Sequence, residues 1–276
     1  MASSLFSRSE IVFGNQLAEE SMAAKKLACE PLATQLTEND LTMPRRKRRS
    51  VIISLSYRMV WFSKNILGRK RMLSWCLNTS WLMRRFAFEL SSEVFGDLFQ
   101  REARALSEDV LQRWIPPGGS VLDIGCGPGR WSRLAAQYAD SVVGIDQSEV
   151  NIKIARQMTT ASNIKYVVGD VTQNVDRYHF DVAILVHVIE HIENVDRLLA
   201  AISNVASTLI IEVPDFEADP LNMARYALSC PYYSDGDHVR EYTLTILTEQ
   251  LDRNHWNIQH LERRHAAILV VATRTA

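Results

Sequence analysis

An apolar segment that runs directly into a glycine-rich turn, VLDIGCGPGRWS at residues 121–132, constrains this chain more than any other feature. Its glycines stand at alternate positions, Gly125, Gly127 and Gly129. Glycine is needed where the backbone takes a positive φ or where a ligand lies directly against it. A helix that begins after such a turn also presents free N–H groups. The segment predicts a strand, a turn and a helix that form a ligand site, although a structural turn or a dinucleotide site has a similar pattern.

Three later segments place polar residues where predicted strands end. The run VVGID ends at Asp146, the run YVV at residues 166–168 is followed by Gly169 and Asp170, and FDVAILV ends before His187. Open α/β sheets bind ligands at the carboxyl ends of their strands, and a carboxylate there can accept both hydroxyl groups of a ribose. These residues are therefore expected to lie around one ligand.

In this order and spacing, the four segments resemble the class I S-adenosylmethionine-dependent methyltransferases over roughly residues 100–276. A nicotinamide-dependent enzyme would more usually have glycine or alanine at the sixth position of the turn, where this chain has Arg130. The resemblance implies an enzyme whose cofactor is S-adenosylmethionine. It implies that the glycine backbone contacts the methionine and ribose portion of that cofactor.

Strand and helix patterns alternate until the last two predicted strands, WNIQHLERR and HAAILVVATR, which form a hairpin. A helical pattern extends from Ser92 to Trp114, Ser148 is a candidate N-cap of a later helix, and Asn194 or Glu193 begins another. Alternation predicts a parallel sheet, and the hairpin adds an antiparallel strand near its edge. The fold class is therefore α/β and Rossmann-like: a seven-stranded, mostly parallel sheet with one antiparallel strand, helices on both faces and an N-terminal helical extension.

The resemblance also assigns roles to the residues around the cofactor. Asp123 would bind its amino group, Asp146 its ribose hydroxyls and Asp170 its adenine amino group. Asp123 could instead only brace the glycine turn, and Asp170 could be a helix cap. The full predicted cofactor-binding set is Asp123, Gly125, Cys126, Gly127, Gly129, Asp146, Gln147, Asp170, Val171 and His187.

A second group of residues bears on the chemistry: His187, Glu190 and His191 would share one face of a helical turn, and His238 follows downstream. The group resembles the metal-dependent O-methyltransferases that modify the terminal ribose of small RNAs, and in part the ubiquinone-pathway O-methyltransferases. Those families usually have a glutamate where this chain has His187. Three histidines and one glutamate suit zinc, iron or manganese better than magnesium.

Three interpretations of this group stay open. His187, Glu190, His191 and His238 could hold a metal, His187 or His191 could be the catalytic base without a metal, or the group could be structural. In the first two, methyl transfer is to oxygen, because a sugar hydroxyl has a high pKa and needs a base or a metal.

The balance of basic and acidic residues differs between two parts of the chain. Residues 41–88 carry twelve Lys and Arg and no acidic residue, whereas residues 89–276 carry an excess of Asp and Glu. Aromatic residues are interleaved with the basic clusters, and the apolar runs are too short to cross a bilayer. We predict a loosely ordered tail at 1–44, a basic aromatic helical extension or cap at 45–95 and the methyltransferase domain at 96–276.

The basic segment 45–88 has three interpretations. Its helices could cap the cofactor cleft, with aromatic side chains packed inward; they could lie on an anionic membrane surface; or they could contact nucleic acid, which is less favoured because the catalytic part is acidic. The four cysteines show no pairing pattern, and no secretory signal is visible. We therefore expect a cytoplasmic protein, with peripheral contact at the inner membrane surface if the second interpretation holds.

The expected acceptor is a hydroxyl on a sugar, a glycan or another small hydroxylated molecule. Polar and aromatic residues just before His238 are of the kind that hold saccharides, and they are Tyr232, Tyr233, Asp235 and Asp237. The alternatives are a methyltransferase of the RNA ribose 2′-oxygen and, from another class, a cofactor-binding partner subunit without catalysis.

Overall fold

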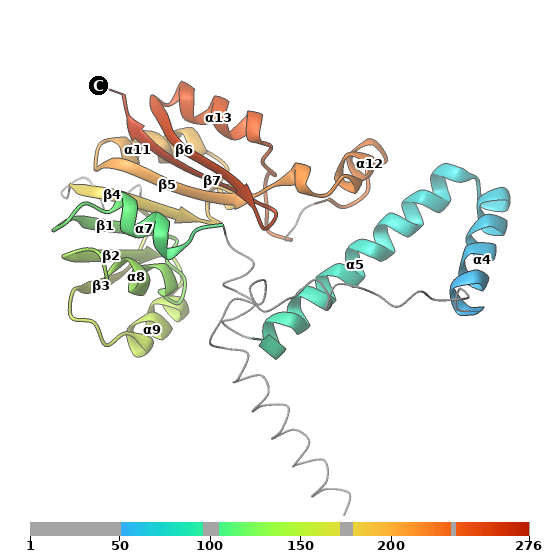
Figure 1. The fold of residues 1–276 in the computed structure, drawn as a ribbon, viewed down its shortest axis with the longest axis horizontal. Coiled ribbons are helices and arrows are strands. Elements are labelled where there is room, and N and C mark those ends of the chain that lie inside the picture. The colour runs from blue at the N-terminus through green and yellow to red at the C-terminus, as the bar shows by residue number, and fades with distance from the viewer. Residues whose placement is uncertain (1–50, 96–104, 172–178, 233–235, 276) are drawn as a thin grey trace, which may run out of the picture. The chain divides into compact units, whose positions relative to one another are not determined.

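The computed structural model describes residues 51–95, 105–171, 179–232 and 236–275. The chain divides into two compact units, residues 1–103 and 104–276. In the first unit, helices α4 (Val51–Leu67) and α5 (Arg69–Phe95) contact one another and are joined at Gly68, whose φ is +83° (Figure 1). The predicted tail at 1–44 and the basic run at 45–49 lie outside the described residues, so the prediction for them stays open.

The second unit contains a seven-stranded sheet with the order β3-β2-β1-β4-β5-β7-β6 (Figure 1). Its first five strands pair in parallel, and β7 runs antiparallel to both of its neighbours. This confirms the predicted sheet and its terminal hairpin. The strands are β1 (Ser120–Ile124), β2 (Ser141–Asp146), β3 (Ile164–Val168), β4 (Phe180–Val186), β5 (Ala206–Pro214), β6 (Trp256–Arg264) and β7 (Ala267–Arg274).

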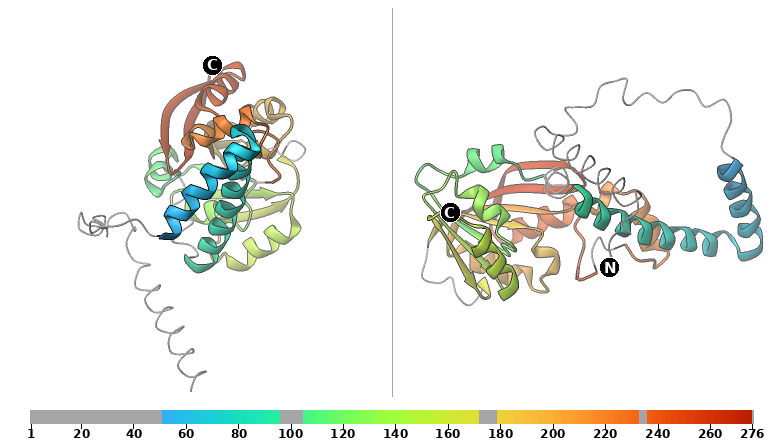
Figure 2. Two further views of the ribbon diagram at one scale, coloured as in Figure 1. Left: turned by 90° about the vertical axis from the view of Figure 1, so that its right-hand side faces the viewer. Right: turned by 90° about the horizontal axis from the view of Figure 1, so that it is seen from below.

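Helices pack on both faces of this sheet (Figure 2). On one face lie α7 (Glu108–Trp114), α8 (Arg130–Ala135) and α9 (Glu149–Met158). On the other lie α11 (Val195–Ser203) and α13 (Leu244–Arg253). Strand side chains alternate between the faces, so within β4 Val182 and Ile184 join the first layer and Ala183 and Leu185 the second.

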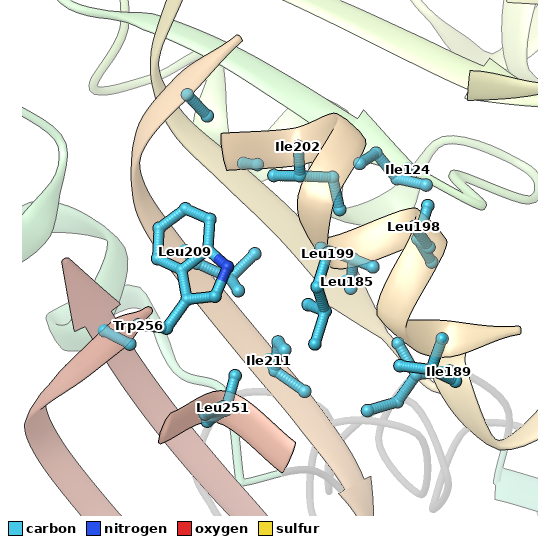
Figure 3. Close-up of a cluster of buried hydrophobic side chains, with 14 of the residues drawn as sticks. Ile124, Leu185, Ile189, Leu198, Leu199, Ile202, Leu209, Ile211, Leu251 and Trp256 are labelled. Atoms are coloured by element: carbon cyan, nitrogen blue, oxygen red, sulfur yellow. The ribbon is translucent and has the colours of Figure 1, made fainter. Parts of the chain in front are cut away.

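The larger core cluster lies between β4, β5, β7 and the α11–α13 face (Figure 3). Leu198, Leu199 and Ile202 of α11 point toward the sheet because their spacing puts them on one side of the helix. Trp256 is almost fully buried beside Leu209 and Leu251. The buried strands are continuous apolar runs, as expected for parallel strands that are covered on both faces.

The structure tests three local predictions. Ser148 caps α9 by accepting a hydrogen bond from the Asn151 N–H, and Asn194 caps α11 through the Arg197 N–H, so both N-caps are confirmed. A continuous helix from Ser92 to Trp114 is wrong, because the chain is not helical from residue 105 to 107. The reason is tertiary: Leu106 is buried, and its N–H is used in a hydrogen bond to a distant carboxylate on β5.

No helix in the described part of the chain is long and apolar enough to cross a membrane.

Candidate active site

The glycine turn between β1 and α8 has the backbone that its sequence predicts. Gly125, Gly127 and Gly129 have φ values of +65°, +51° and +79°. A Cβ atom at Gly125 would collide with Val188 and one at Gly129 with the Tyr166 ring, whereas one at Gly127 would meet nothing within 4 Å. Two of these glycines are therefore required by packing as well as by φ, and the third faces open space that a ligand can enter.

Asp146 joins the end of β2 to this turn. Its Oδ2 accepts the N–H of Gly127 at 2.8 Å, and its Oδ1 accepts the N–H of Ser148 at 2.8 Å. Each carboxylate oxygen has a second acceptor site. The carboxylate is thus fixed at the turn while keeping acceptor capacity for the predicted ribose hydroxyls, a contact that stays a prediction.

Asp123 lies beneath the turn and is 2% exposed. The Ser132 hydroxyl donates to its Oδ2 at 2.5 Å. Burial raises the pKa of Asp123 to about 7, against the lowering effect of the Ser132 hydrogen bonds. The Ser132 contact matches the bracing role, and it leaves Oδ1 for the predicted amino group of the cofactor.

The remaining predicted cofactor residues lie around the same sheet edge. Gln147 is exposed, Asp170 is half-buried and Val171 is buried. The Gly169 N–H donates to the Asp146 carbonyl at 3.0 Å and so ties the end of β3 to the end of β2. Cys126 is buried within the turn, and burial raises the pKa of its thiol, as suits a small packing residue.

His187 directly follows β4 and has a φ of +55°, which places it in the left-handed region. Its Nδ1 lies 3.1 Å from Oε1 of Glu190, and its Nε2 lies 3.0 Å from Oε1 of Glu212. The helical turn that we predicted for His187, Glu190 and His191 is a 3₁₀ turn, Ile189–His191, which His187 precedes. The three residues therefore do not share one helical face.

Glu212 is a functional residue that the sequence reasoning missed. It lies on β5, is fully buried, and accepts the backbone N–H of Leu106 at 2.5 Å on Oε2. The available signal was a single charge inside the apolar strand ASTLIIEVP. A carboxylate is rarely buried without partners, so its position predicts a polar neighbour.

Three of the four predicted metal ligands lie together in the structure. Ligand atoms of Glu190, His191 and His238 all lie within 4.8 Å of one another, and the two imidazole rings meet edge to face with centroids 4.6 Å apart. His187 lies outside this group, between Glu190 and Glu212. The loop of His238 is held in place because the N–H groups of Val239 and Arg240 donate to the Glu190 carbonyl.

The Glu190 carboxylate is the unusual member of this group. Its side chain is fully buried, and neither carboxylate oxygen has a hydrogen-bond donor in the described residues, since the nearby His187 nitrogen is not aligned. A buried carboxylate without a donor is costly. Around it, Asp237 Oδ2 lies 3.3 Å from His191 Nδ1, and Glu241 Oε1 lies 2.9 Å from His238 Nδ1.

The fold and the site together define a class. A glycine turn after β1, an acidic residue at the end of β2 and the sheet order with an antiparallel seventh strand are the features of S-adenosylmethionine-dependent methyltransferases. A sequence profile of a family described as "Methyltransferase domain" matches residues 97–261. The chain belongs to this methyltransferase domain family.

Individual relatives match shorter parts of this chain than the family profile does. The chain is 36% identical over 78 residues to a ubiquinone biosynthesis O-methyltransferase of Pelagibacter ubique, covering 28% of this chain and 32% of that one. The Agrobacterium fabrum protein of that name is 40% identical over 83 residues, covering 29% and 33%. The chain thus spans about a third of the length of these curated relatives.

Two solved structures have the same fold. A magnesium protoporphyrin IX methyltransferase of Synechocystis, with bound S-adenosylhomocysteine, has a TM-score of 0.50 at 19% identity, covering 61% of this chain and 82% of that one. A Haloferax volcanii protein in complex with the Trm112 methyltransferase activator has a TM-score of 0.53 at 14% identity, covering 69% and 94%. At these identities the likeness concerns the fold alone.

Proposed function

We propose that this protein transfers the methyl group of S-adenosylmethionine to a hydroxyl oxygen. The observation that carries the proposal is the buried Glu190 carboxylate, which has no hydrogen-bond donor among the described residues and lies against His191 and His238 just beyond β4. A structural cluster would be expected to satisfy such a group. The local identity to two O-methyltransferases supports oxygen as the atom that is methylated.

The reaction is an in-line displacement. The hydroxyl oxygen forms a bond to the methyl carbon, the carbon–sulfur bond breaks with its electrons going to sulfur, and the hydroxyl proton leaves to a base. Alignment of the two reactants can contribute on the order of 7–11 kcal/mol to lowering the barrier. Because the sulfonium is already reactive, the protein has two tasks: to hold the reactants in line and to assist loss of the proton.

A divalent metal ion fits the cluster chemically. Glu190, His191 and His238 would hold it, since they offer one carboxylate and two imidazoles from a confined space, and the unsatisfied carboxylate would gain a partner. When bound, the ion would lower the pKa of an acceptor hydroxyl. His187 and Glu212 would then keep the Glu190 side chain in position rather than bind the ion.

Without a metal, His191 is the residue best placed to take the proton. Its Nδ1 lies 3.3 Å from Asp237 Oδ2, and the imidazole is partly exposed. This nitrogen makes no hydrogen bond within the described residues, so it remains able to take a proton. Both ring nitrogens of His187, in contrast, face buried carboxylates. His187 therefore fits a positioning role better than that of a base.

The proposed acceptor is a sugar, a glycan or another small hydroxylated molecule. Tyr232 contributes to a small aromatic group with Phe216 and Tyr226, with ring centroids 5.6 and 5.9 Å apart. This group lies in the segment between β5 and α13, which contains α12 (Leu221–Ala227) and also carries His238. Aromatic faces of this kind can stack on a ring. Tyr233 and Asp235 lie outside the described residues.

The test combines metal analysis with an activity assay. Untagged, chelator-free protein is analysed for zinc, iron and manganese beside a His191→Ala/His238→Ala variant and a His179→Ala control, whose exposed imidazole lies away from the cluster. Formation of S-adenosylhomocysteine is followed with sugar, diol and phenol acceptors and with a ribose-ended RNA.

We expect transfer to at least one hydroxyl acceptor, loss of transfer in the double variant and full transfer in the control. Metal that is lost only in the double variant would establish the cation, and metal-free, active protein would leave His191 as the base. Methylation of a nitrogen acceptor, or unchanged activity in the double variant, would contradict the proposal. Cofactor binding with no transfer to any acceptor would favour the non-catalytic partner subunit.

A further inference from the structure

Helix α4 has an apolar stripe that the described residues of its own unit leave exposed. Leu55, Met59, Phe62 and Ile66 follow one another at intervals of four, three and four residues, so they lie on one side of the helix. Their exposed fractions are 52%, 70%, 62% and 67%. Large apolar side chains gathered on one exposed face mark a surface that binds something.

Helix α5, drawn in cyan to green in Figures 1 and 2, also exposes large apolar side chains. Trp75, Leu82 and Phe86 are spaced seven and four residues apart on one side of the helix and are 60%, 43% and 49% exposed. Trp61, on α4, is 60% exposed as well. Aromatic side chains of this kind are enriched where proteins meet the boundary between water and hydrocarbon.

Basic side chains accompany the apolar ones on both helices. Arg58 and Lys64 lie on α4, and the run Arg69, Lys70, Arg71 opens α5 directly after the bend at Gly68. All three residues of that run are exposed. No Asp or Glu occurs between residues 41 and 88, and Glu89 and Glu93 follow toward the end of α5. Residues 51–88 therefore combine exposed apolar side chains with a net positive charge.

We infer that the α4–α5 pair, residues 51–95, binds the surface of an anionic lipid membrane, independently of which acceptor is methylated. An amphipathic helix with Lys and Arg beside large apolar residues lies in the plane of such a surface, with its apolar face at the acyl boundary. Neither helix is apolar enough to cross the bilayer. A second copy of the pair would bring like charges together, and RNA would not require the stripe on α4.

The experiment is vesicle co-sedimentation of the full chain. Vesicles of phosphatidylcholine alone are compared with vesicles that also contain phosphatidylglycerol. We expect binding to the anionic vesicles to be at least about tenfold tighter and to weaken as salt rises from about 0.1 to 0.5 M, because the charge contribution is screened. Equal binding to both vesicle types, or none to either, would overturn the inference.

Two matched pairs of variants separate the apolar and charged contributions. Met59→Ser/Phe62→Ser removes apolar surface from α4, and Met158→Ser/Ile246→Ser removes exposed apolar surface from α9 and α13. Lys70→Gln/Arg71→Gln removes two charges from α5, and Lys153→Gln/Lys165→Gln removes two exposed charges from the second unit. We expect about a tenfold loss for each α4–α5 variant and less than about twofold for its control.

Three further results would contradict the inference. One is that the controls lose as much binding as the α4–α5 variants. Another is that an RNA oligonucleotide binds to the same residues while anionic vesicles do not. The third is that size-exclusion chromatography with light scattering finds a dimer that the Met59→Ser/Phe62→Ser change dissociates without affecting vesicle binding. The charge variant leaves the apolar faces intact. It therefore still tests the inference if the apolar variant folds poorly.

Discussion

The glycine turn and the histidine cluster both lie where parallel strands of one sheet end, but their acidic side chains differ in the hydrogen bonds that they accept. At the turn, Asp146 accepts two backbone N–H groups and Asp123 accepts the Ser132 hydroxyl. In the cluster, the Glu190 carboxylate is fully buried without a hydrogen-bond donor in the described residues. The carboxylates of the turn accept hydrogen bonds in the free protein, whereas the Glu190 carboxylate has His187 Nδ1 3.1 Å away but accepts no hydrogen bond from the described residues.

This difference is expected if the turn binds the cofactor and the cluster assists loss of a proton. A site that binds an abundant cofactor by its shape benefits from a backbone that is already fixed, because little freedom is lost on binding. A site that assists loss of a proton needs a group that is not neutralised by the protein itself. If this interpretation is right, substitutions at the turn should affect cofactor affinity, and those in the cluster should affect the rate of transfer.

The sharpest test of the comparison is Glu190→Gln. We expect methyl transfer to fall by a factor of about 10² or more, because the carboxylate beside His191 and His238 is replaced by an amide. Stability should change little or rise, since a neutral amide costs less to bury than a carboxylate without a donor. Single-turnover transfer rates and thermal unfolding measure the two effects.

For Glu190→Gln, the control is Glu217→Gln, a change at a partly exposed carboxylate 3.3 Å from Arg263. It should leave transfer unchanged and cost at most about 1 kcal/mol. A Glu190→Gln protein that transfers methyl at the normal rate would remove the distinction between the cluster and the turn.

At the turn, Gly127→Ala and Gly129→Ala should have different effects. Both place a side chain at positive φ, which costs roughly 1–2 kcal/mol. Only Gly129→Ala also collides with the Tyr166 ring, so its total destabilisation should be about 2–5 kcal/mol once overpacking is added. Gly127→Ala should fold but bind S-adenosylhomocysteine about tenfold or more weakly, because its methyl group enters the open space.

Calorimetric titration and chemical denaturation check this pair of variants, and each serves as the control for the other. If Gly127→Ala bound the cofactor normally, the open space beside that glycine would not be part of the cofactor site.

The third prediction concerns Glu212, which contacts His187 beside the cluster, and its expected effect is smaller. Glu212→Gln keeps an oxygen for the Leu106 N–H but places an amide beside His187 Nε2, so the charge-assisted hydrogen bond is lost. We expect a loss of about 1.5–3 kcal/mol in the free energy of unfolding. His187→Gln should cost a similar amount, and the double variant should cost less than the sum, because both changes break one contact.

Chemical denaturation of the two single variants and the double variant measures that coupling. Strictly additive costs would mean that the pair does not act as a unit, and His187 would lose its assignment as a positioning residue.

The sequence predicted the conformation of the glycine turn better than the arrangement of the histidine cluster. The glycine turn depends on local conformation, so the alternate spacing of Gly125, Gly127 and Gly129 was enough to predict it. The mostly parallel sheet with one antiparallel strand followed from alternating patterns and one hairpin. In contrast, the contact of Glu212 with Leu106 joins residues 106 positions apart, and no local pattern records it.

His187 shows the same limit. Its spacing to Glu190 and His191 is that of a helix, but the chain enters the turn with a positive φ and forms only a 3₁₀ turn. The His187 N–H is instead used to continue the pairing with β5 through the Glu212 carbonyl. Tertiary hydrogen bonding therefore overrides the helical spacing, and it places His187 between Glu190 and Glu212, outside the group of Glu190, His191 and His238.

The last expected effect concerns the pH dependence of the turn. Because burial raises the pKa of Asp123 from 3.8 to about 7, the folded protein keeps this proton in a range where the unfolded chain has lost it. Stability of the free protein should therefore fall as pH rises from about 4 to 7 and then level off. If Asp123 binds the amino group of the cofactor, affinity for S-adenosylhomocysteine should change in the opposite direction, weakening up to about tenfold per pH unit below 7.

Asp123→Asn should remove both trends, since the amide does not titrate, while Asp140→Asn at an exposed site should leave both intact. Calorimetric titrations and unfolding curves between pH 5 and 8 provide the measurement. A pH-dependent stability with a pH-independent affinity would show that Asp123 only braces the turn through Ser132. The carboxylate beneath the glycines would then be structural, and the contrast with Glu190 would rest on Asp146 alone.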